Sequence, residues 1–157
     1  MKSPKLYFYD TGLLCWLLGI CEAQQIATHP LRGNIFETFM VTELMKSQLN
    51  SRKEVSFHFW RDSNGNEIDL IVDNGTTHIP IEIKSGQILN RDFFTGLRRW
   101  HDMAGNMSIN PTLIFGGRNR QVRNGIQVYG WRDVARYFKK NKGTGAYNLL
   151  RTQPTNP

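Results

Sequence analysis

Two carboxylates and a lysine occupy neighbouring positions in two segments that have the alternating pattern of β-strands. Asp69 lies in the segment 67–72, and Glu82 and Lys84 alternate with isoleucines in the segment 79–84. Successive side chains of a strand point to opposite faces, so each segment has a row of apolar side chains, at 68, 70 and 72 in the first and at 79, 81 and 83 in the second. These two rows lie on the same face of the sheet only if odd positions of one segment pair with even positions of the other. Every such register places Asp69 beside Glu82 and Lys84.

The same alternation divides the first of these strands into an apolar and a polar face. We expect Ile68, Leu70 and Val72 on one side, with Glu67, Asp69 and Ile71 on the other. One explanation of the polar side is that it is the solvated face of a hairpin. Asp, Glu and Lys are, however, depleted from strands, and here they occupy the centres of two adjacent ones, which favours a functional cause.

A further carboxylate, Glu37, lies in a segment with helical periodicity. On a helical wheel Met40, Val41 and Leu44 fall within about 60° of Glu37, so its side chain points toward the expected core. A buried carboxylate must be protonated, paired or bound to a metal. A local alternative is a capping box, in which Asn34 caps the helix and Glu37 turns back to the Asn34 amide. The two roles are compatible.

The chemistry of such a cluster is that of hard cations and phosphates. Asp69 and Glu82 would supply oxygen ligands to Mg²⁺ or Mn²⁺, with Glu37 completing the metal shell or holding a second ion. The metal would activate a bound water and polarise a scissile phosphate. Lys84 would orient that water or neutralise developing charge. Glu37, Asp69, Glu82 and Lys84 are therefore the candidate catalytic residues.

The remaining pattern predicts the elements that position these residues. Asp10 as N-cap and Gly19 as terminator enclose a short apolar helix, which we expect to be buried or covered. The chain of 157 residues suits a single domain. We expect helical elements within 10–50 and a sheet with its helices within 54–140. The individual expectations are helices at 34–49, 91–103 and 131–140, strands at 55–61, 67–72, 79–84, 111–115 and 126–129, and a disordered tail at 151–157.

Charge is distributed unevenly along the chain. The net charge is +7, but residues 1–83 carry a net −3 and residues 84–157 a net +10. A basic half beside an acidic half indicates a polyanionic partner such as DNA, although a cationic surface without any such partner has the same composition. The alternatives for the basic residues are a solvated loop and ordinary helix-surface charge. The candidate nucleic-acid-binding residues are Arg91, Arg98, Arg99, Arg118, Arg120, Lys139 and Lys140.

Several classes of protein do not match the sequence. The longest apolar stretch, 13–20, is far shorter than the roughly 20 residues of a membrane-spanning helix. The N-terminus lacks the order of segments of a secretory signal, so we expect no membrane association and a cytoplasmic protein. Cys15 and Cys21 lack metal-ligand spacing, and we interpret both as reduced thiols.

The segments GNIFE at 33–37, EID at 67–69 and IEIKSG at 81–86 resemble the PD-(D/E)XK nuclease superfamily. More closely, KLYFYDTGL at 5–13 and FWR at 59–61 are similar to the uncharacterised C-terminal domain of bacterial and archaeal AAA-type ATPases. The resemblance covers roughly residues 3–130. It implies an α/β fold with a restriction-endonuclease-like αβββαβ core, a central mixed sheet flanked by helices, and metal-site roles for Glu37, Asp69, Glu82 and Lys84.

The sequence departs from these families in two places, which shape the expected function. Ile68 stands where the superfamily has a proline, and no GxxxxGK[ST] phosphate-binding loop is present, so an ATPase module would have to be a partner outside this chain. The leading expectation is one nuclease-like domain over 1–150, a Mg²⁺-dependent DNA hydrolase forming the C-terminal part or remnant of an AAA-type ATPase. The alternatives are a non-catalytic nucleic-acid or partner-binding domain that regulates an ATPase, and a structural module whose carboxylates form salt bridges.

Overall fold

The computed structural model describes residues 4–50 and 56–134, which form an α/β fold. Three antiparallel neighbours, β1 (Phe57–Arg61), β2 (Glu67–Asp73) and β3 (His78–Lys84), begin a six-stranded mixed sheet. β4 (Thr112–Phe115) and β6 (Ile126–Gly130) continue it in parallel, and β5 (Gln121–Arg123) closes the edge antiparallel to β6. The strand order is β1-β2-β3-β4-β6-β5.

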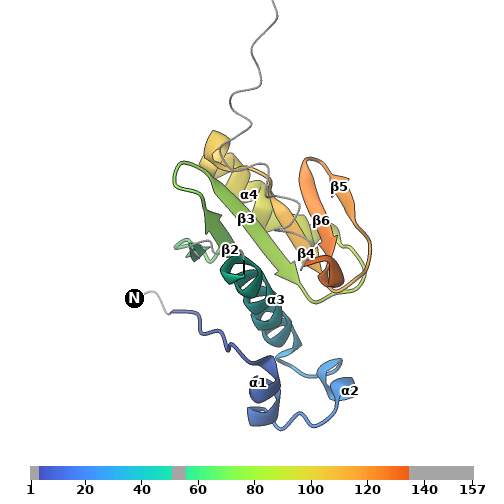
Figure 1. The fold of residues 1–157 in the computed structure, drawn as a ribbon. Coiled ribbons are helices and arrows are strands. Elements are labelled where there is room, and N and C mark those ends of the chain that lie inside the picture. Colours follow the sequence, from blue (N-terminus) through green and yellow to red (C-terminus); the bar gives the residue numbers. More distant parts are fainter. Residues whose placement is uncertain (1–3, 51–55, 135–157) are drawn as a thin grey trace, which may run out of the picture.

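Helices cover both faces of this sheet (Figure 1). α3 (Arg32–Leu49) lies across one face, and α4 (Thr95–Ala104), preceded by the short helix η1 (Arg91–Phe94), lies on the other. The order α3-β1-β2-β3-α4-β4 confirms the expected αβββαβ sequence of elements and the α/β class. The remaining elements are α1 (Thr11–Leu17), α2 (Ala23–Ile26), η2 (Gly105–Met107) and η3 (Trp131–Asp133).

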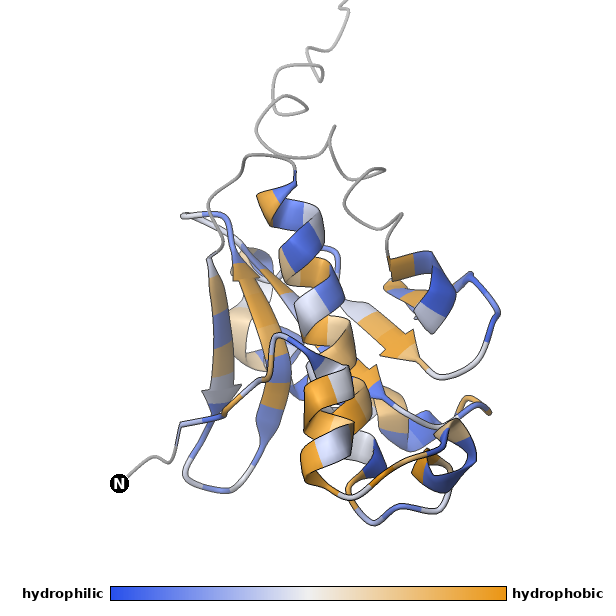
Figure 2. Cartoon of the chain, turned by 60° about the horizontal axis from the view of Figure 1, so that its bottom comes forward, coloured by the Kyte–Doolittle hydropathy of each residue, from blue (hydrophilic) through white to orange (hydrophobic). Residues whose placement is uncertain are grey.

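Two hydrophobic clusters separate the faces of the sheet. On the α3 side, Met40, Val41 and Leu44 pack against isoleucines of β3. On the α4 side, Leu97 and Trp100 pack against β2, β4 and β6. The strands near the middle of the sheet are accordingly coloured mostly as hydrophobic in Figure 2. Because β3 is covered on both sides, a polar side chain in the middle of this strand is withdrawn from solvent.

The pairing of β2 with β3 follows the expected register. Leu70 pairs with Ile81 and Val72 with Ile79, so even positions of β2 oppose odd positions of β3. The expected face of one residue is wrong, however: Ile68 packs in the α4-side cluster together with Ile71, whereas Leu70 lies in the α3-side cluster. An irregularity in β2, described below, breaks the alternation between these residues.

The N-terminal elements agree with the sequence in position but not in burial. Asp10 caps α1 by accepting the N–H groups of Gly12 and Leu13, and Gly19 after the helix has φ 72°. The expectation that α1 is buried is wrong among the described residues, because it contains no buried residue and Trp16 is 73% exposed; whether another protein covers it stays a prediction. Neither α2 nor β5 was expected from the sequence.

Three expectations cannot be compared with the structure. The final helix at 131–140 lies in the described part only through η3, and Lys139, Lys140 and the tail at 151–157 lie outside the described residues. Within the described residues, no helix is both long and apolar enough to cross a membrane.

Candidate metal and nuclease site

A β-bulge places Asp69 between the two faces of the sheet. His58 of β1 pairs with Ile71, but Trp60 pairs with Ile68, so two β2 residues, Asp69 and Leu70, lie opposite one residue of β1. Such a bulge inserts one residue and reverses the alternation beyond it. The Asp69 carboxylate, 3% exposed as a residue, accepts the backbone N–H of Ile83 at 2.8 Å through Oδ2. Its side chain thus takes the place of a backbone acceptor at the point where β2 and β3 separate.

Glu82 and Lys84 meet Asp69 at this point, as the register argument predicts. Lys84 Nζ lies 3.3 Å from Asp69 Oδ2 and 2.6 Å from Glu82 Oε2. The contact with Glu82 is a close ion pair, and among the described residues that buried oxygen has no donor other than this ammonium. Glu82 is 3% exposed. The explanation that these carboxylates form a solvated face is therefore wrong for Asp69 and Glu82.

Gly96, in the first turn of α4, allows the helix to approach Glu82. A Cβ at position 96 would lie within van der Waals overlap of the Glu82 carboxylate and 3.3 Å from the carbonyl oxygen of Glu67. A side chain of any size at this position would push the carboxylate or the helix away. The absence of a side chain at Gly96 is what fits the Glu82 carboxylate between β3 and α4.

Glu37 joins the cluster from α3, but not in the way that a capping box requires. The helix begins at Arg32, two residues before Asn34, and its N-cap position, Leu31, makes no side-chain cap. The Asn34 capping box is therefore wrong. Glu37 Oε1 instead accepts the Tyr7 hydroxyl at 2.6 Å and the Lys5 ammonium at 3.0 Å.

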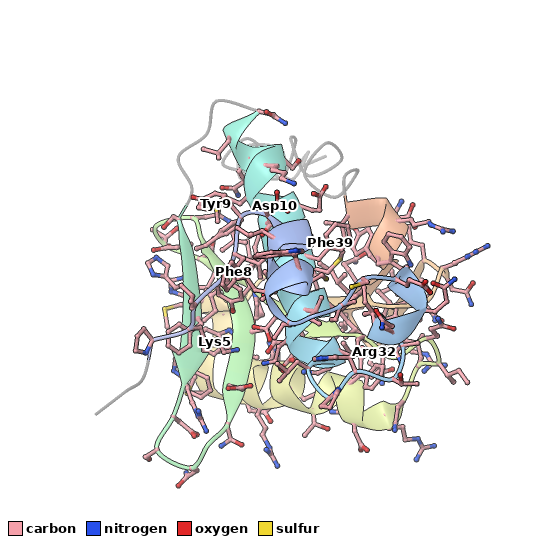
Figure 3. The ribbon with its side chains drawn as sticks, turned by 90° about the horizontal axis from the view of Figure 1, so that it is seen from below. Lys5, Phe8, Tyr9, Asp10, Arg32 and Phe39 are labelled. Carbon is pink, nitrogen blue, oxygen red and sulfur yellow. The ribbon has the colours of Figure 1, made fainter. Side chains whose placement is uncertain are left out.

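The partners of Glu37 come from an N-terminal segment that leads from the β1–β2 strand pair to α1 beside α3 (Figure 3). Thr42 on α3 donates to the Phe8 carbonyl at 3.1 Å and fixes this segment. Lys5 Nζ also lies 3.6 Å from Asp69 Oδ1 and 3.9 Å from Glu67 Oε1. A pocket of about 380 Å³ adjoins this point, and Lys5, Tyr7 and Asp69 are among the residues that line it.

Burial and mutual charge shift several pKa values in the cluster. Burial, followed by the negative charge of Asp69, raises the pKa of Glu82 to about 8, against the opposing charge of Lys84. For Lys84, burial lowers the pKa, but the charges of Asp69 and Glu82 outweigh it and the net shift is upward. Burial and then the hydrogen bond to Glu37 raise the pKa of Tyr7. Burial lowers the pKa of Lys5, but the hydrogen bond to Glu37 and the charges of the nearby carboxylates outweigh burial, so the net shift of this pKa is upward.

The oxygen ligands in the cluster suit a hard cation, but the carboxylates do not surround a single point at which one ion could bind them all. Asp69, Glu82 and Glu37 offer the carboxylate oxygens that Mg²⁺ and Mn²⁺ prefer, and the buried Glu82 Oε2 has the Lys84 ammonium as its partner. Among the described residues, no three His, Cys, Asp or Glu side chains stand together as a metal site. Two ammonium groups, those of Lys5 and Lys84, lie between the carboxylates.

The candidate DNA-binding residues are distributed over the α4 side and the β5 edge. Arg91 and Arg98 line a pocket of about 620 Å³ together with Arg123, and none of the clustered carboxylates lines it. Arg99 donates to Asn66 in the β1–β2 turn. Arg120 stacks over the Tyr129 ring at 5.0 Å, and Arg118 is exposed.

Sequence reasoning missed three functional candidates: Lys5, Tyr7, and Glu67 as a third carboxylate near Lys5. The alternation of β2 does place Glu67 on the side of Asp69, which was the available signal. No local pattern connects Lys5 or Tyr7 with Glu37, because about 30 residues separate them along the chain.

Comparisons with known proteins add a family but no activity. The family described as "Domain of unknown function (DUF4143)" matches residues 32–134. Uncharacterised proteins of Mycobacterium bovis and Mycobacterium tuberculosis are each 32% identical to this chain over 83 residues, or 53% of its length. The matched segment spans 18% of each relative. The matched family region contains Glu37, Asp69, Glu82 and Lys84 but begins after Lys5 and Tyr7.

Proposed function

This chain belongs to the DUF4143 family, a domain of unknown function, and we propose that it is a Mg²⁺- or Mn²⁺-dependent nuclease domain that hydrolyses phosphodiester bonds in DNA. One observation carries the proposal. Asp69 and Glu82, each 3% exposed, reach the same Lys84 ammonium from adjoining strands. Two buried carboxylates and a lysine at one point are costly to a fold and suit metal-assisted phosphate chemistry.

Each residue has a separate role in this function. Asp69 and Glu82, with Glu37 beside them, would hold the ion. The bound ion would supply an activated water and a Lewis acid for the phosphate. The Ile83 N–H fixes the orientation of Asp69. Lys84, already in contact with both carboxylates, would neutralise negative charge that develops on the phosphate.

The basic residues of the α4 side would bind the DNA backbone. Arg91, Arg98 and Arg123 line one pocket, and guanidinium groups are suited to phosphate oxygens. Binding through several phosphate contacts releases counterions, so affinity for DNA should fall steeply between about 50 and 200 mM salt. An affinity independent of salt would contradict this part of the proposal.

A non-catalytic binding domain that regulates an AAA-type ATPase is the second candidate. The observation that favours it is the apolar surface of α1, where Leu13, Trp16 and Leu17 are 50%, 73% and 56% exposed. Exposed apolar residues grouped on one helix are typical of a protein interface. In this function the acidic cluster is held by its two lysines and cleaves nothing.

A cleavage assay separates the two candidates. Linear, branched and single-stranded DNA would be incubated with Mg²⁺ or Mn²⁺ and the wild type, Lys84→Ala, Asp69→Asn or Lys46→Ala. Lys84→Ala should lower cleavage by about 10²- to 10³-fold with little change in metal affinity, because its charge acts mainly in the transition state. Asp69→Asn keeps an oxygen for the Ile83 N–H but should lose both cleavage and metal binding.

Lys46→Ala is the matched control, because Lys46 pairs with Glu43 on the exposed side of α3. Its cleavage rate should equal that of the wild type. Circular dichroism and thermal melts of all variants must agree before rates are compared. A wild type that binds Mg²⁺ but cuts none of the three DNA forms would overturn the nuclease function and leave the binding domain.

A further inference from the structure

Lys5 occupies the point at which carboxylates from two elements converge. Its ammonium lies 3.0 Å from Glu37 Oε1 on α3, 3.6 Å from Asp69 Oδ1 and 3.9 Å from Glu67 Oε1, both on β2. Only the Glu37 contact has hydrogen-bond geometry. A single positive charge thus stands among three carboxylates, in a position where a small cation with oxygen ligands would have the same neighbours.

The two oxygens of Asp69 serve different partners. Oδ2 accepts the Ile83 N–H and lies 3.3 Å from Lys84, which places it on the Glu82 side of the cluster. Oδ1 lies toward Lys5. A divalent ion bound at Oδ1 would therefore take the place of the Lys5 ammonium without breaking the contacts that hold Asp69 in the sheet.

We propose that Lys5 is an internal counter-cation, and that Mg²⁺ or Mn²⁺ loads the site between Glu37 and Asp69 by displacing the Lys5 ammonium. The inference rests on the proposed function, because it concerns the Glu37 and Asp69 Oδ1 side of the acidic cluster that would hold the metal. A doubly charged ion compensates the converging carboxylates better than one ammonium does, and Lys84 stays in place as the lysine of the loaded site.

The anchoring of the N-terminal segment permits this exchange. Tyr7 and Phe8 are tied to α3 through the Tyr7 hydroxyl and the Phe8 carbonyl. Lys5 itself precedes both anchors, and its neighbour Leu6 is 80% exposed. The lysine side chain has a flexible four-carbon stem, so its ammonium can turn into solvent while the segment remains attached.

Metal titration calorimetry of the whole chain tests the exchange. Mn²⁺ and Mg²⁺ would be titrated into the wild type, Lys5→Met and the control Lys46→Met. An ammonium 3.0 Å from Glu37 and 3.6 Å from Asp69 competes strongly with a metal ion for these carboxylates, even when solvent partly screens its charge. Lys5→Met should bind metal at least about tenfold more tightly than the wild type, and Lys46→Met should not differ from it.

The other outcomes distinguish the exchange from the proposed function. Equal or weaker metal affinity in Lys5→Met, with clear binding by the wild type, would overturn the exchange and leave the metal-dependent function standing. Binding by neither protein would overturn the metal-dependent function and the exchange with it. If Lys5→Met folds poorly, Lys5→Gln and the rise in melting temperature on adding Mn²⁺ provide the same comparison. That rise should be larger for the variant than for the wild type.

Discussion

Gly96→Ala tests the packing on which the site depends. In most helices alanine is preferred over glycine by about 0.5–1 kcal/mol, because glycine loses more backbone freedom on folding. At position 96, however, the added Cβ overlaps the Glu82 carboxylate, because it would lie 3.1 Å from Cδ of Glu82. The carboxylate is a flexible group, but it is 4% exposed and already paired with Lys84 at 2.6 Å, so little room is left for it to move.

The size of the effect follows from these opposing contributions. Overpacking of a filled site costs about 1–3 kcal/mol, which exceeds the gain in helix propensity. Gly96→Ala should therefore lower the free energy of unfolding by about 1–2 kcal/mol. Gly33→Ala in α3 is the matched control, because a Cβ there meets nothing within 4 Å. That variant should be neutral or more stable than the wild type by up to about 1 kcal/mol.

Urea denaturation of the wild type, Gly96→Ala, Glu82→Ala and the double variant measures the change in the free energy of unfolding and tests whether Glu82 causes it. In a Glu82→Ala background the overlapping group is gone, so Gly96→Ala should become neutral or stabilising, and the two substitutions should be non-additive by more than about 1 kcal/mol. If Gly96→Ala stabilises the wild type as Gly33→Ala does, Glu82 does not lie against α4 and the described geometry of the site is wrong.

Three further predictions concern single contacts. Glu82 has a raised pKa of about 8 against an ordinary 4.5. Its contribution to the free energy of unfolding is therefore complete below pH 4.5 and is lost as the pH rises toward 8, by at most about 1.4 kcal/mol per pH unit. Glu82→Gln should flatten this decline in urea melts at pH 5, 6.5 and 8, and parallel plots of stability against pH for the variant and the wild type would contradict the prediction. Tyr7→Phe removes a 2.6 Å hydrogen bond to a carboxylate and should cost about 1–3 kcal/mol in thermal melts, whereas Tyr9→Phe at an exposed position should change nothing. Arg32→Ala releases the Ser85 carbonyl, now held at 2.9 Å, and should speed hydrogen exchange in residues 85–90; unchanged exchange would mean that the contact does not order this loop.

The sequence predicted the relation between β2 and β3 because that relation depends on local alternation alone. The apolar side chains of the two strands must lie on one face, which requires even positions of β2 to pair with odd positions of β3. Every register of this kind brings Asp69, Glu82 and Lys84 together. The same reasoning assigned Ile68 to the wrong face. The bulge arises where β2 pairs with β1, and nothing within β2 itself marks the inserted residue.

The partners of Glu37 were beyond the reach of sequence patterns for a different reason. The helical wheel correctly turned Glu37 toward other elements, but its neighbours depend on how the N-terminal segment crosses α3. A local partner, Asn34, was available and wrong, because the helix begins at Arg32 and its N-cap position is Leu31. The exposure of α1 was missed likewise, since an apolar helix predicts a covering element without indicating whether this chain supplies it.

The bulge gives Asp69 a structural role in addition to the metal-binding role that we propose for it. Its carboxylate satisfies a main-chain donor of the sheet, and a chain that had ceased to bind metal would still be selected to keep it. The side-chain hydrogen bonds of Glu37 and Lys84 go to other side chains among the described residues, so neither side chain is tied to the main chain of the sheet as Asp69 is. If the proposed function is right, related chains that cleave DNA should keep Glu37 and Lys84, whereas Asp69 should also be kept in related chains that have the bulge but no activity.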